Sequence, residues 1–401
     1  MKAIIGQSLA VGTIVAPPSK SMAHRMLIGA GLAHGKSVVR NIELSEDVKA
    51  TLEILGALGA EYSIHDHEVE IHGIGGKNIR ASHVLNSRES GSTLRFFIPL
   101  LLTGGSSCEF IGAKRLFERP LGIYEEICKS QGILFDKGET SLKLAGQLQA
   151  TDYKVLGDVS SQFITGLLFA LPLLKEDSTL EILPPIESKA YIDLTLEALE
   201  TFGIVIKREG NTYYMPGGQV YQPKEVRVEG DYSNAAFLES FNLVQGNVKV
   251  EGLNPNSKQG DKVYQSYFTA LKQGTPTLDI SECPDLGPIL MGMAAVCNGA
   301  RFTGTRRLRI KESDRGAVMA EELAKFGICV TVKENEIEVH KGMLKKPTAL
   351  LESHNDHRIA MTLSVLLSSV GGEINGAEAV RKSYPSFYED LKKLGIIVDI
   401  I

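Results

Sequence analysis

The sequence predicts an α/β (α+β) protein of two similar domains, and three observations support this. The chain has 401 residues, more than a single hydrophobic core usually serves, so two domains are the first expectation. Hydrophobic residues make up 43% of it and charged residues 23%, which suits buried cores and differs from a disordered chain. A phrase of helix, glycine, strand, turn and strand also recurs along the sequence.

The recurring phrase divides the chain into six units. Copies lie at 52–73, 124–146, 196–218, 320–342 and 388–401, with a degenerate copy at 267–280. In four of the copies apolar residues stand four and one positions before the glycine, as Leu55 and Leu58 do before Gly59, which places them on one helical face. The glycine is expected to end the helix in a left-handed conformation. Alternating runs split by polar turns then predict a hairpin.

The spacing of the reference glycines sets the size of each unit. These glycines are Gly59, Gly132, Gly203, Gly274, Gly327 and Gly395, mostly about seventy residues apart. Such units are too long for a solenoid repeat. We therefore expect a few large α/β units, three in each domain.

Charge and cysteine content limit the classes of function. The net charge is −5, from 43 basic and 48 acidic residues, which argues against a nucleic-acid-binding protein but leaves room for a local basic pocket. The five cysteines contain no C-x-x-C pair, so buried thiols in a reducing compartment are expected, and neither a disulfide framework nor a zinc site is.

The N-terminal segment is predicted to form a strand. Residues 3–16 weakly resemble a short signal peptide, but Gln7 and Ser8 interrupt the apolar run and no convincing cleavage site follows. The apolar run after Arg95 is far shorter than the ~20 residues of a membrane span. We expect a soluble, cytoplasmic protein with no membrane partner.

In the first half, polar motifs precede apolar helices. Residues 16–25, APPSKSMAHR, place two serines, a lysine and an arginine around a helix start, where free N–H groups and the helix dipole favour an anion. The motifs SGSTLR at 90–95 and SSQF at 160–163 have the same character, as does SKAY at 188–191. Each motif alone could be an ordinary capped surface helix.

The motifs in the second half of the sequence contain acidic residues as well as basic ones. The segment PDLGP at 284–288 puts Asp285 before an apolar helix, and RIKESDR at 309–315 packs five charges into seven residues. The segment HNDHR opens another apolar helix at 354–358, and KSYP follows at 382–385. Arginines suit bidentate binding of phosphate and carboxylate, so the motifs together predict a site for a pair of compact anionic ligands between two domains. HNDH followed by arginine makes a poor metal cage, and the sequence has neither a P-loop nor a Rossmann fingerprint.

Nine motifs in this order resemble the 5-enolpyruvylshikimate-3-phosphate synthase family. They are PPSKSMAHR, SGSTLR, ERP, SSQF, SKAYID, PDLGP, RIKESDR, NDHRIAM and KSYPSF, and they span Pro17 to Phe387. The resemblance implies two domains, each of three β-α-β-α-β-β units in a pseudo-threefold arrangement, with the active site in the interdomain cleft. It also implies that the chain crosses between the domains twice, so we expect one domain over 18–229 and the other over 1–17 plus 230–401.

The resemblance implies transfer of the carboxyvinyl group of phosphoenolpyruvate to the 5-hydroxyl of shikimate 3-phosphate, with release of phosphate. Asp285 is then the expected base, Glu312 the expected acid, and Lys20 an aid to proton movement. Shikimate 3-phosphate is expected to contact Lys20, Ser21, Arg25, Ser160, Ser161, Gln162, Ser188, Asp285 and Lys311. Phosphoenolpyruvate is expected to contact Lys20, Gly91, Arg119, Gln162, Arg315, Arg358 and Lys382. No metal or cofactor is expected.

Two positions depart from the family pattern. Arg307 stands where an asparagine-type residue is usual, and Glu89 stands where a small amide is usual. Gly91 is retained, which in this family goes with binding of the competitive inhibitor glyphosate. We therefore expect inhibition by glyphosate, with altered ligand contacts near the two departures.

Other functions remain open from the sequence. The sister enzyme that uses UDP-N-acetylglucosamine would need Lys-Asn near the start and a reactive cysteine on a long loop, whereas Ser21 follows Lys20, and Cys108 and Cys128 lie in apolar settings. An RNA-end cyclase conflicts with the acidic balance. A non-catalytic anion-binding protein would have no use for Asp285 and Glu312. We expect a monomer, because no long exposed apolar stripe is evident.

Overall fold

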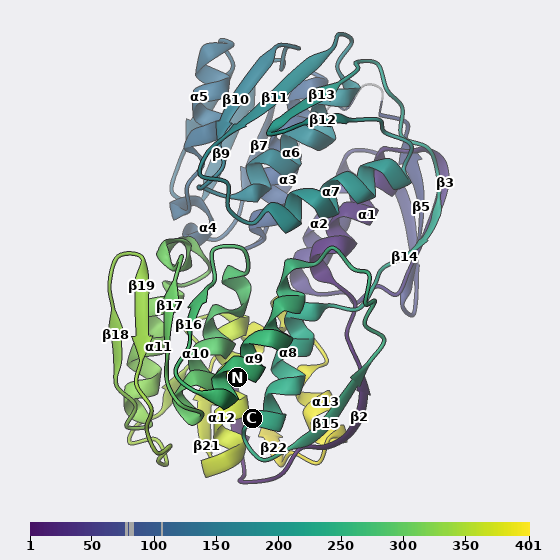
Figure 1. Ribbon diagram of the computed structural model, residues 1–401. Coiled ribbons are helices and arrows are strands. Elements are labelled where there is room, and N and C mark those ends of the chain that lie inside the picture. The colour runs from purple at the N-terminus through teal and green to yellow at the C-terminus, as the bar shows by residue number, and fades with distance from the viewer. Residues whose placement is uncertain (77–78, 80–83, 106) are drawn as a thin grey trace. The chain divides into compact units, whose positions relative to one another are not determined.

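The computed structural model describes residues 1–76, 79, 84–105 and 107–401 (Figure 1). The chain divides into two compact units, one formed by Lys20–Val228 and the other by Met1–Ser19 together with Glu229–Ile401. The domain boundaries expected from the sequence lie beside these divisions. No helix in the described ranges combines the length and the apolarity needed to cross a bilayer.

The unit Lys20–Val228 alternates helices with short strands. Its helices are α1 (Lys20–Leu32), α2 (Glu46–Ala57), α3 (Gly91–Thr103), α4 (Lys114–Glu118), α5 (Gly122–Ser130), α6 (Ser161–Ala170), η1 (Leu171–Leu173) and α7 (Lys189–Thr201). Its strands are β3 (His34–Arg40), β4 (Glu61–His65), β5 (Glu68–Ile74), β6 (Val84–Asn86), β7 (Ser107–Ile111), β8 (Leu134–Lys137), β9 (Ser141–Ala145), β10 (Asp152–Leu156), β11 (Ser178–Leu183), β12 (Lys207–Glu209), β13 (Thr212–Met215) and β14 (Glu225–Arg227). They form sheets in the orders β14-β3-β5-β4, β6-β7-β9-β8 and β10-β11-β13-β12.

The second unit repeats this design. Its helices are α8 (Tyr232–Ser240), η2 (Phe241–Leu243), η3 (Gly260–Val263), α9 (Tyr264–Gln273), η4 (Pro284–Leu286), α10 (Gly287–Val296), η5 (Arg306–Ile310), α11 (Arg315–Lys325), α12 (His357–Val370), η6 (Ala377–Lys382) and α13 (Phe387–Lys393). Its strands are β1 (Lys2–Ile5), β2 (Val11–Val15), β15 (Asn247–Glu251), β16 (Thr277–Asp279), β17 (Ala300–Thr303), β18 (Val330–Val332), β19 (Glu336–Val339), β20 (Leu351–Glu352), β21 (Gly372–Asn375) and β22 (Val398–Ile400). The sheet orders are β16-β17-β19-β18, β20-β21-β1-β22 and β15-β2.

The four-stranded sheets share one pattern of strand directions. Their first two strands run parallel, as β16 does with β17, and the remaining neighbours are antiparallel. Figure 1 shows β16, β17, β19 and β18 side by side along one flank of their unit. The N-terminal segment forms two strands, because β1 pairs with β21 and β22 while β2 pairs with β15. The hairpin predicted to recur along the chain is therefore part of a sheet topology that the four-stranded sheets share.

The reference glycines confirm the repeat and locate its exception. Five of the six have positive φ: Gly59 at 100°, Gly132 at 68°, Gly203 at 80°, Gly327 at 82° and Gly395 at 89°. The left-handed conformation predicted at Gly274 is wrong, because its φ of 173° is extended. This glycine leads directly into β16, the first strand of the next sheet, so no hairpin follows the degenerate copy.

Buried helices lie at the centre of each unit. In Lys20–Val228, α3 packs on α6, and α7 packs on both α6 and α1. In the other unit, α8, α10 and α12 contact one another. Helices covered on most sides need apolar residues almost all round, which explains the sequences FFIPLLL and ILMGMAAV. Polar motifs are therefore concentrated at their N-termini.

The cysteines follow the prediction only in part. Cys108, Cys128 and Cys283 are buried, and Cys297 is half-buried. Cys329 is exposed, so the expectation of buried thiols is wrong there. It lies just before the short strand β18 at the edge of its sheet, where side chains reach solvent.

Candidate active site

A buried arginine joins the first two turns of three helices in the unit Lys20–Val228. Arg25 lies one turn into α1, and its Nη1 donates to the carbonyl of Ser21 at 2.6 Å. Its Nε donates to Thr195 Oγ1 at 2.9 Å, and its Nη2 donates to Thr165 Oγ1 at 3.3 Å and to the Tyr191 carbonyl at 3.0 Å. These contacts bring the starts of α1, α6 and α7 together.

The three helix starts carry predicted ligands of shikimate 3-phosphate. Lys20 and Ser21 begin α1, and Ser160 caps α6 by accepting from the N–H of Gln162 at 3.3 Å. Ser188 is buried and precedes α7 with a left-handed φ of 57°. Helix N-termini attract anions, so this arrangement suits a phosphate or a carboxylate.

The charge of Arg25 adds to this attraction. Burial lowers its pKa to about 10, which still leaves the guanidinium charged at neutral pH. The acceptors named above are hydroxyls and carbonyls, none of which carries a charge. A buried cation held by neutral groups favours the arrival of an anion.

A second buried arginine, Arg95, organises the start of α3. It lies four residues after Gly91, as Arg25 does after Ser21, and its Nη1 donates to the Gly91 carbonyl at 3.4 Å. The same Nη1 donates to Gln162 Oε1 at 3.2 Å, and Nη2 donates to the Pro120 carbonyl at 2.9 Å. Gln162 Nε2 in turn donates to Ser92 Oγ at 3.0 Å.

Gly91 lies against two guanidinium groups. A Cβ built on it would lie 2.7 Å from Arg119 Nη1 and 2.8 Å from Arg95 Nη1. Arg119 is itself buried. Predicted ligands of phosphoenolpyruvate, Gly91, Arg119 and Gln162, are therefore gathered around Arg95, and only glycine leaves the arginines room.

A chain of hydroxyls ties α1 to the Gly91 turn. His24 Nδ1 is 2.8 Å from Thr51 Oγ1, which is 2.8 Å from Thr93 Oγ1. Thr93 Oγ1 donates to Ser90 Oγ at 2.7 Å, and Ser90 caps α3. Burial, with Lys20 and Arg25 nearby, holds the pKa of His24 well below its usual range, so the imidazole is neutral and serves as a structural link.

Lys20 is paired with a carboxylate that the sequence analysis did not single out. Its Nζ lies 2.9 Å from Asp47 Oδ2, on α2, and both side chains are largely buried. The pair fixes the lysine at the start of α1. Asp47 could have been suspected only from the helix that follows Ser45, because no motif marks it.

In the other unit, Asp285 is bound by three cations. Its Oδ1 is 3.1 Å from Lys311 Nζ and 2.9 Å from Arg315 Nη1. Its Oδ2 is 3.0 Å from Arg358 Nη2. Arg315 Nη2 also lies 2.9 Å from Glu312 Oε2. One guanidinium therefore binds both carboxylates that are predicted to transfer protons, those of Asp285 and Glu312.

Asp356 also binds the guanidinium of Arg315. Its Oδ2 accepts from Arg315 Nε at 2.8 Å and from Ser313 Oγ at 3.1 Å, and its Oδ1 caps α12 through the N–H of Arg358 at 2.9 Å. Burial alone would lower the pKa of Arg315, but Asp356, Glu312 and Asp285 raise it above its ordinary value. Arg315 is therefore a permanent cation.

Lys311 has an unusual environment for an ammonium group. Burial lowers its pKa to about 8. The carboxylate of Asp285 opposes this lowering, and the guanidinium of Arg307 strengthens it. Arg307, the departure from the family pattern, is itself buried in η5. The extra charge thus acts on a predicted ligand of shikimate 3-phosphate.

Lys382 reaches the same region from η6. Its Nζ donates to the carbonyl of Asn355 at 2.6 Å, one residue before Asp356. The predicted residues thus form two groups around Arg25 and Arg95 in one unit, and one group around Asp285 in the other. Arg95, Asp356 and Asp47 are the positioning residues that sequence reasoning missed. Arg95 and Asp356 lie inside quoted motifs, but nothing in the sequence shows their partners.

Comparison with known proteins matches these motifs to one family. The model of the family described as EPSP synthase (3-phosphoshikimate 1-carboxyvinyltransferase) matches residues 5–391. The chain belongs to this family. A 3-phosphoshikimate 1-carboxyvinyltransferase of Clostridium kluyveri is 39% identical over 412 residues, covering 97% of this chain and 96% of that protein. One of Clostridium perfringens is 39% identical over 421 residues, covering 99% of each chain.

Solved structures of EPSP synthases agree with this membership. The EPSP synthase of Acinetobacter baumannii matches with a TM-score of 0.78 at 25% identity, covering 100% of this chain and 99% of that one. The predicted fold class of two similar α/β domains is confirmed by this match and by the repeated sheet topology. In this member of the EPSP synthase family, the motif arginines Arg25, Arg119, Arg315 and Arg358 are all buried.

Proposed function

We propose that this chain transfers the carboxyvinyl group of phosphoenolpyruvate to the 5-hydroxyl of shikimate 3-phosphate and releases phosphate. Family membership over residues 5–391 supports the reaction. The observation that carries it is that Asp285 and Glu312 bind the same guanidinium, that of Arg315, each at 2.9 Å. Two carboxylates held beside a fixed cation suit a reaction that moves protons on adjacent atoms of anionic substrates. The product lies on the route to chorismate and the aromatic amino acids.

The groups around Arg25 and Arg95 are assigned to substrate binding. Shikimate 3-phosphate binds at the starts of α1, α6 and α7, through Ser21, Arg25, Ser160, Ser161, Gln162 and Ser188. Phosphoenolpyruvate binds beside Gly91 and Arg119, with Gln162 between the two ligands and Lys20 near the reacting atoms. These roles use the helix N-termini and the buried cations for phosphate and carboxylate.

The group around Asp285 is assigned to proton transfer and charge stabilisation. Glu312 protonates the methylene carbon of phosphoenolpyruvate, which makes the neighbouring carbon electrophilic. Asp285 takes the proton of the attacking hydroxyl, and a tetrahedral intermediate forms. Glu312 then takes a methyl proton back as phosphate leaves, with Arg315, Arg358 and Lys382 stabilising the departing charge. The groups of both units thus serve one reaction.

The substrates replace ion pairs that exist without them. Arg315 and Arg358 are bound to Asp285 in this structure. When the anionic phosphoenolpyruvate takes their donors, an oxygen of Asp285 is freed to accept from the hydroxyl. Lys311, which shares this carboxylate, then contacts shikimate 3-phosphate. The ion pairs hold the cations in place until the substrates arrive.

Phosphate release is the direct test. Purified protein should release phosphate when both phosphoenolpyruvate and shikimate 3-phosphate are present, and neither substrate alone should suffice. Replacing shikimate 3-phosphate with UDP-N-acetylglucosamine should give no release. Release with the sugar nucleotide, or none with both expected substrates, would refute the proposal.

The sugar-nucleotide alternative is not favoured by Cys108 and Cys128. That sister enzyme needs a reactive thiol, and reactivity requires a lowered pKa. Burial raises the pKa of Cys108 to about 11 and that of Cys128 to about 12. Both thiols are therefore protonated and inert at neutral pH.

Further properties complete the proposal. We infer a cytoplasmic monomer that does not bind nucleic acid, in keeping with the net charge of −5. The two domains are proposed to span 18–229 and 1–17 plus 230–401, which differ from the observed compact units by at most two residues.

Replacing Gly91 with alanine should weaken binding of phosphoenolpyruvate and of glyphosate. The new Cβ would meet Arg119 and Arg95 below 3.0 Å, and these side-chain ends must move. Since a hydrogen bond to a charged group is worth about 1.5–3 kcal/mol, KM for phosphoenolpyruvate and the glyphosate concentration for half-inhibition should rise about tenfold or more. Steady-state kinetics measure both. A Gly91→Ala protein with the parent's sensitivity would contradict the proposed contact.

Binding of shikimate 3-phosphate should weaken above pH 8. The pKa of Lys311 is about 8, so its ammonium attracts the anion below that pH and loses its charge above it. The value of kcat/KM for shikimate 3-phosphate, which reports the free enzyme, should therefore bend downward near pH 8. Lys311→Arg should remove this bend, because a guanidinium stays charged. A bend that persists in Lys311→Arg would assign the titration to another group.

A further inference from the structure

The turn before α12 has a backbone conformation that is uncommon for residues other than glycine. His354 and Asn355 have φ values of 51° and 55°, so two consecutive residues other than glycine are left-handed. Such a conformation persists only where the surrounding structure holds it in place. The Asn355 N–H donates to Ser353 Oγ at 3.2 Å, which is a local contact. The remaining support must come from other elements.

This turn fixes the cations expected to bind phosphoenolpyruvate. Asp356 binds Arg315 through both of its oxygens, at 2.8 and 3.3 Å, and caps the helix on which Arg358 lies. Lys382 binds the carbonyl of Asn355 at 2.6 Å. A change in the turn would move all three cations at once.

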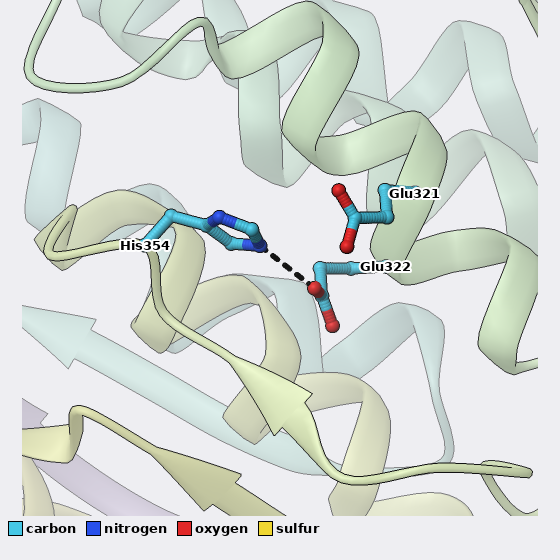
Figure 2. A group of neighbouring side chains, drawn as sticks. All are labelled: Glu321, Glu322 and His354. Atoms are coloured by element: carbon cyan, nitrogen blue, oxygen red, sulfur yellow. Dashed lines mark hydrogen bonds and ion pairs between the residues drawn. The ribbon is translucent and has the colours of Figure 1, made fainter.

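Glu322 on α11 binds this turn through its side chain. Its side chain is fully buried, and its Oε1 lies 2.8 Å from His354 Nε2. Its Oε2 accepts from the backbone N–H of Glu352 at 3.2 Å. Figure 2 shows His354 reaching from its loop toward the Glu322 carboxylate on the helix.

The same face of α11 contacts the 352–356 segment at two points. Arg315 and Glu322 are seven residues apart, which places them on one side of the helix two turns from each other. Arg315 binds Asp356, and Glu322 binds the Glu352 N–H and His354. Both ends of the left-handed turn are therefore attached to one helix.

We propose that Glu322 and His354 are positioning residues that hold the left-handed turn, and thereby orient Arg315, Arg358 and Lys382 for phosphoenolpyruvate. This rests on the proposed function, since it assigns these cations to that substrate. Neither residue touches the reacting atoms. Their effect is on how well the cations match the ligand, and small displacements at a binding site can cost about 10²-fold in rate.

The same cluster does not suit a metal ion. Glu321, Glu322 and His354 present ligand-type atoms within 4.8 Å of one another. However, Lys325 Nζ lies 2.8 and 3.0 Å from the two oxygens of Glu322 and 4.0 Å from Glu321. The ammonium group of Lys325 already occupies the place between these carboxylates that a metal cation would take, and its charge would repel a metal ion.

Substitution of His354 tests the proposal with little risk to folding. Asparagine tolerates the left-handed conformation but is too short to reach Glu322. His354→Asn and Glu322→Gln should each raise KM for phosphoenolpyruvate about tenfold and leave KM for shikimate 3-phosphate unchanged. Glu321→Gln is the matched control: it is the neighbouring acid on the same helix, is exposed, and should behave as the parent.

A purely structural role predicts a different result. Partial unfolding would lower kcat in proportion to the folded fraction, measured by circular dichroism, and would leave both KM values unchanged; this would overturn the proposal. Equal effects of Glu321→Gln and Glu322→Gln would do the same. Amide hydrogen exchange without substrates gives a readout independent of activity, even if the parent lacked the proposed activity. The N–H of Arg358, bound to Asp356, should exchange faster in His354→Asn, and an unchanged rate would refute the inference.

Discussion

Replacing Asp285 with asparagine should lower kcat about 10³-fold while the protein stays folded. The amide keeps the shape of the carboxylate but cannot take the proton of the attacking hydroxyl, and general base help is worth about 10²–10⁴-fold. The fold should survive because Arg315 keeps Asp356 and Glu312, and Arg358 keeps its bond to Ser233. Phosphate release under saturating substrates measures the loss.

The same substitution should also change the pH dependence of binding. Asp285 raises the pKa of Lys311, opposing burial, so its loss should move that pKa below about 8. The downward bend in kcat/KM for shikimate 3-phosphate should then appear at lower pH. Glu282→Gln is a suitable control, because Glu282 is an exposed acid three residues before Asp285, just ahead of η4. An Asp285→Asn protein with the parent's kcat would exclude Asp285 as the base.

Local sequence patterns predicted the repeated fold because its signals act over a few residues. A glycine such as Gly327 ends a helix in a left-handed conformation with no help from distant parts of the chain. Alternating runs on either side of a short turn likewise specify a hairpin. Gly274 shows the limit: the same local pattern preceded a strand of the next sheet, and the chain remained extended.

The same difference between local and distant signals applies to the candidate site. The positions of the motif residues at helix starts could be predicted from local signals, and a helix N-terminus with serines and an arginine favours an anion. The roles of Arg95 and Asp356 could not, because they depend on partners 67 and 41 residues away, Gln162 and Arg315. The sequence gives the residue types of a site, whereas packing decides which of them bind the ligand and which hold their neighbours.

Replacing Glu312 with glutamine should lower kcat about 10²–10³-fold and leave both KM values close to the parent's. Glutamine can still accept from Arg315, which now binds Glu312 Oε2 at 2.9 Å, so the guanidinium should stay in place. It cannot give a proton to the methylene carbon, and this is the step that makes the neighbouring carbon electrophilic. The matched control is Asp314→Asn in the same segment, since an asparagine can still cap α11 in place of Asp314.

Deuterium exchange separates this role from simple charge stabilisation. If Glu312 both protonates the methylene carbon and takes a proton back, the parent in heavy water should place deuterium in the methylene group of recovered phosphoenolpyruvate. Glu312→Gln should lose this exchange at least as completely as it loses turnover. Should the variant turn over slowly yet exchange deuterium at the parent's rate, proton transfer to carbon would belong to another group. The carboxylate bound to Arg315 would then act only through its charge, and Lys20 would be the next residue to test.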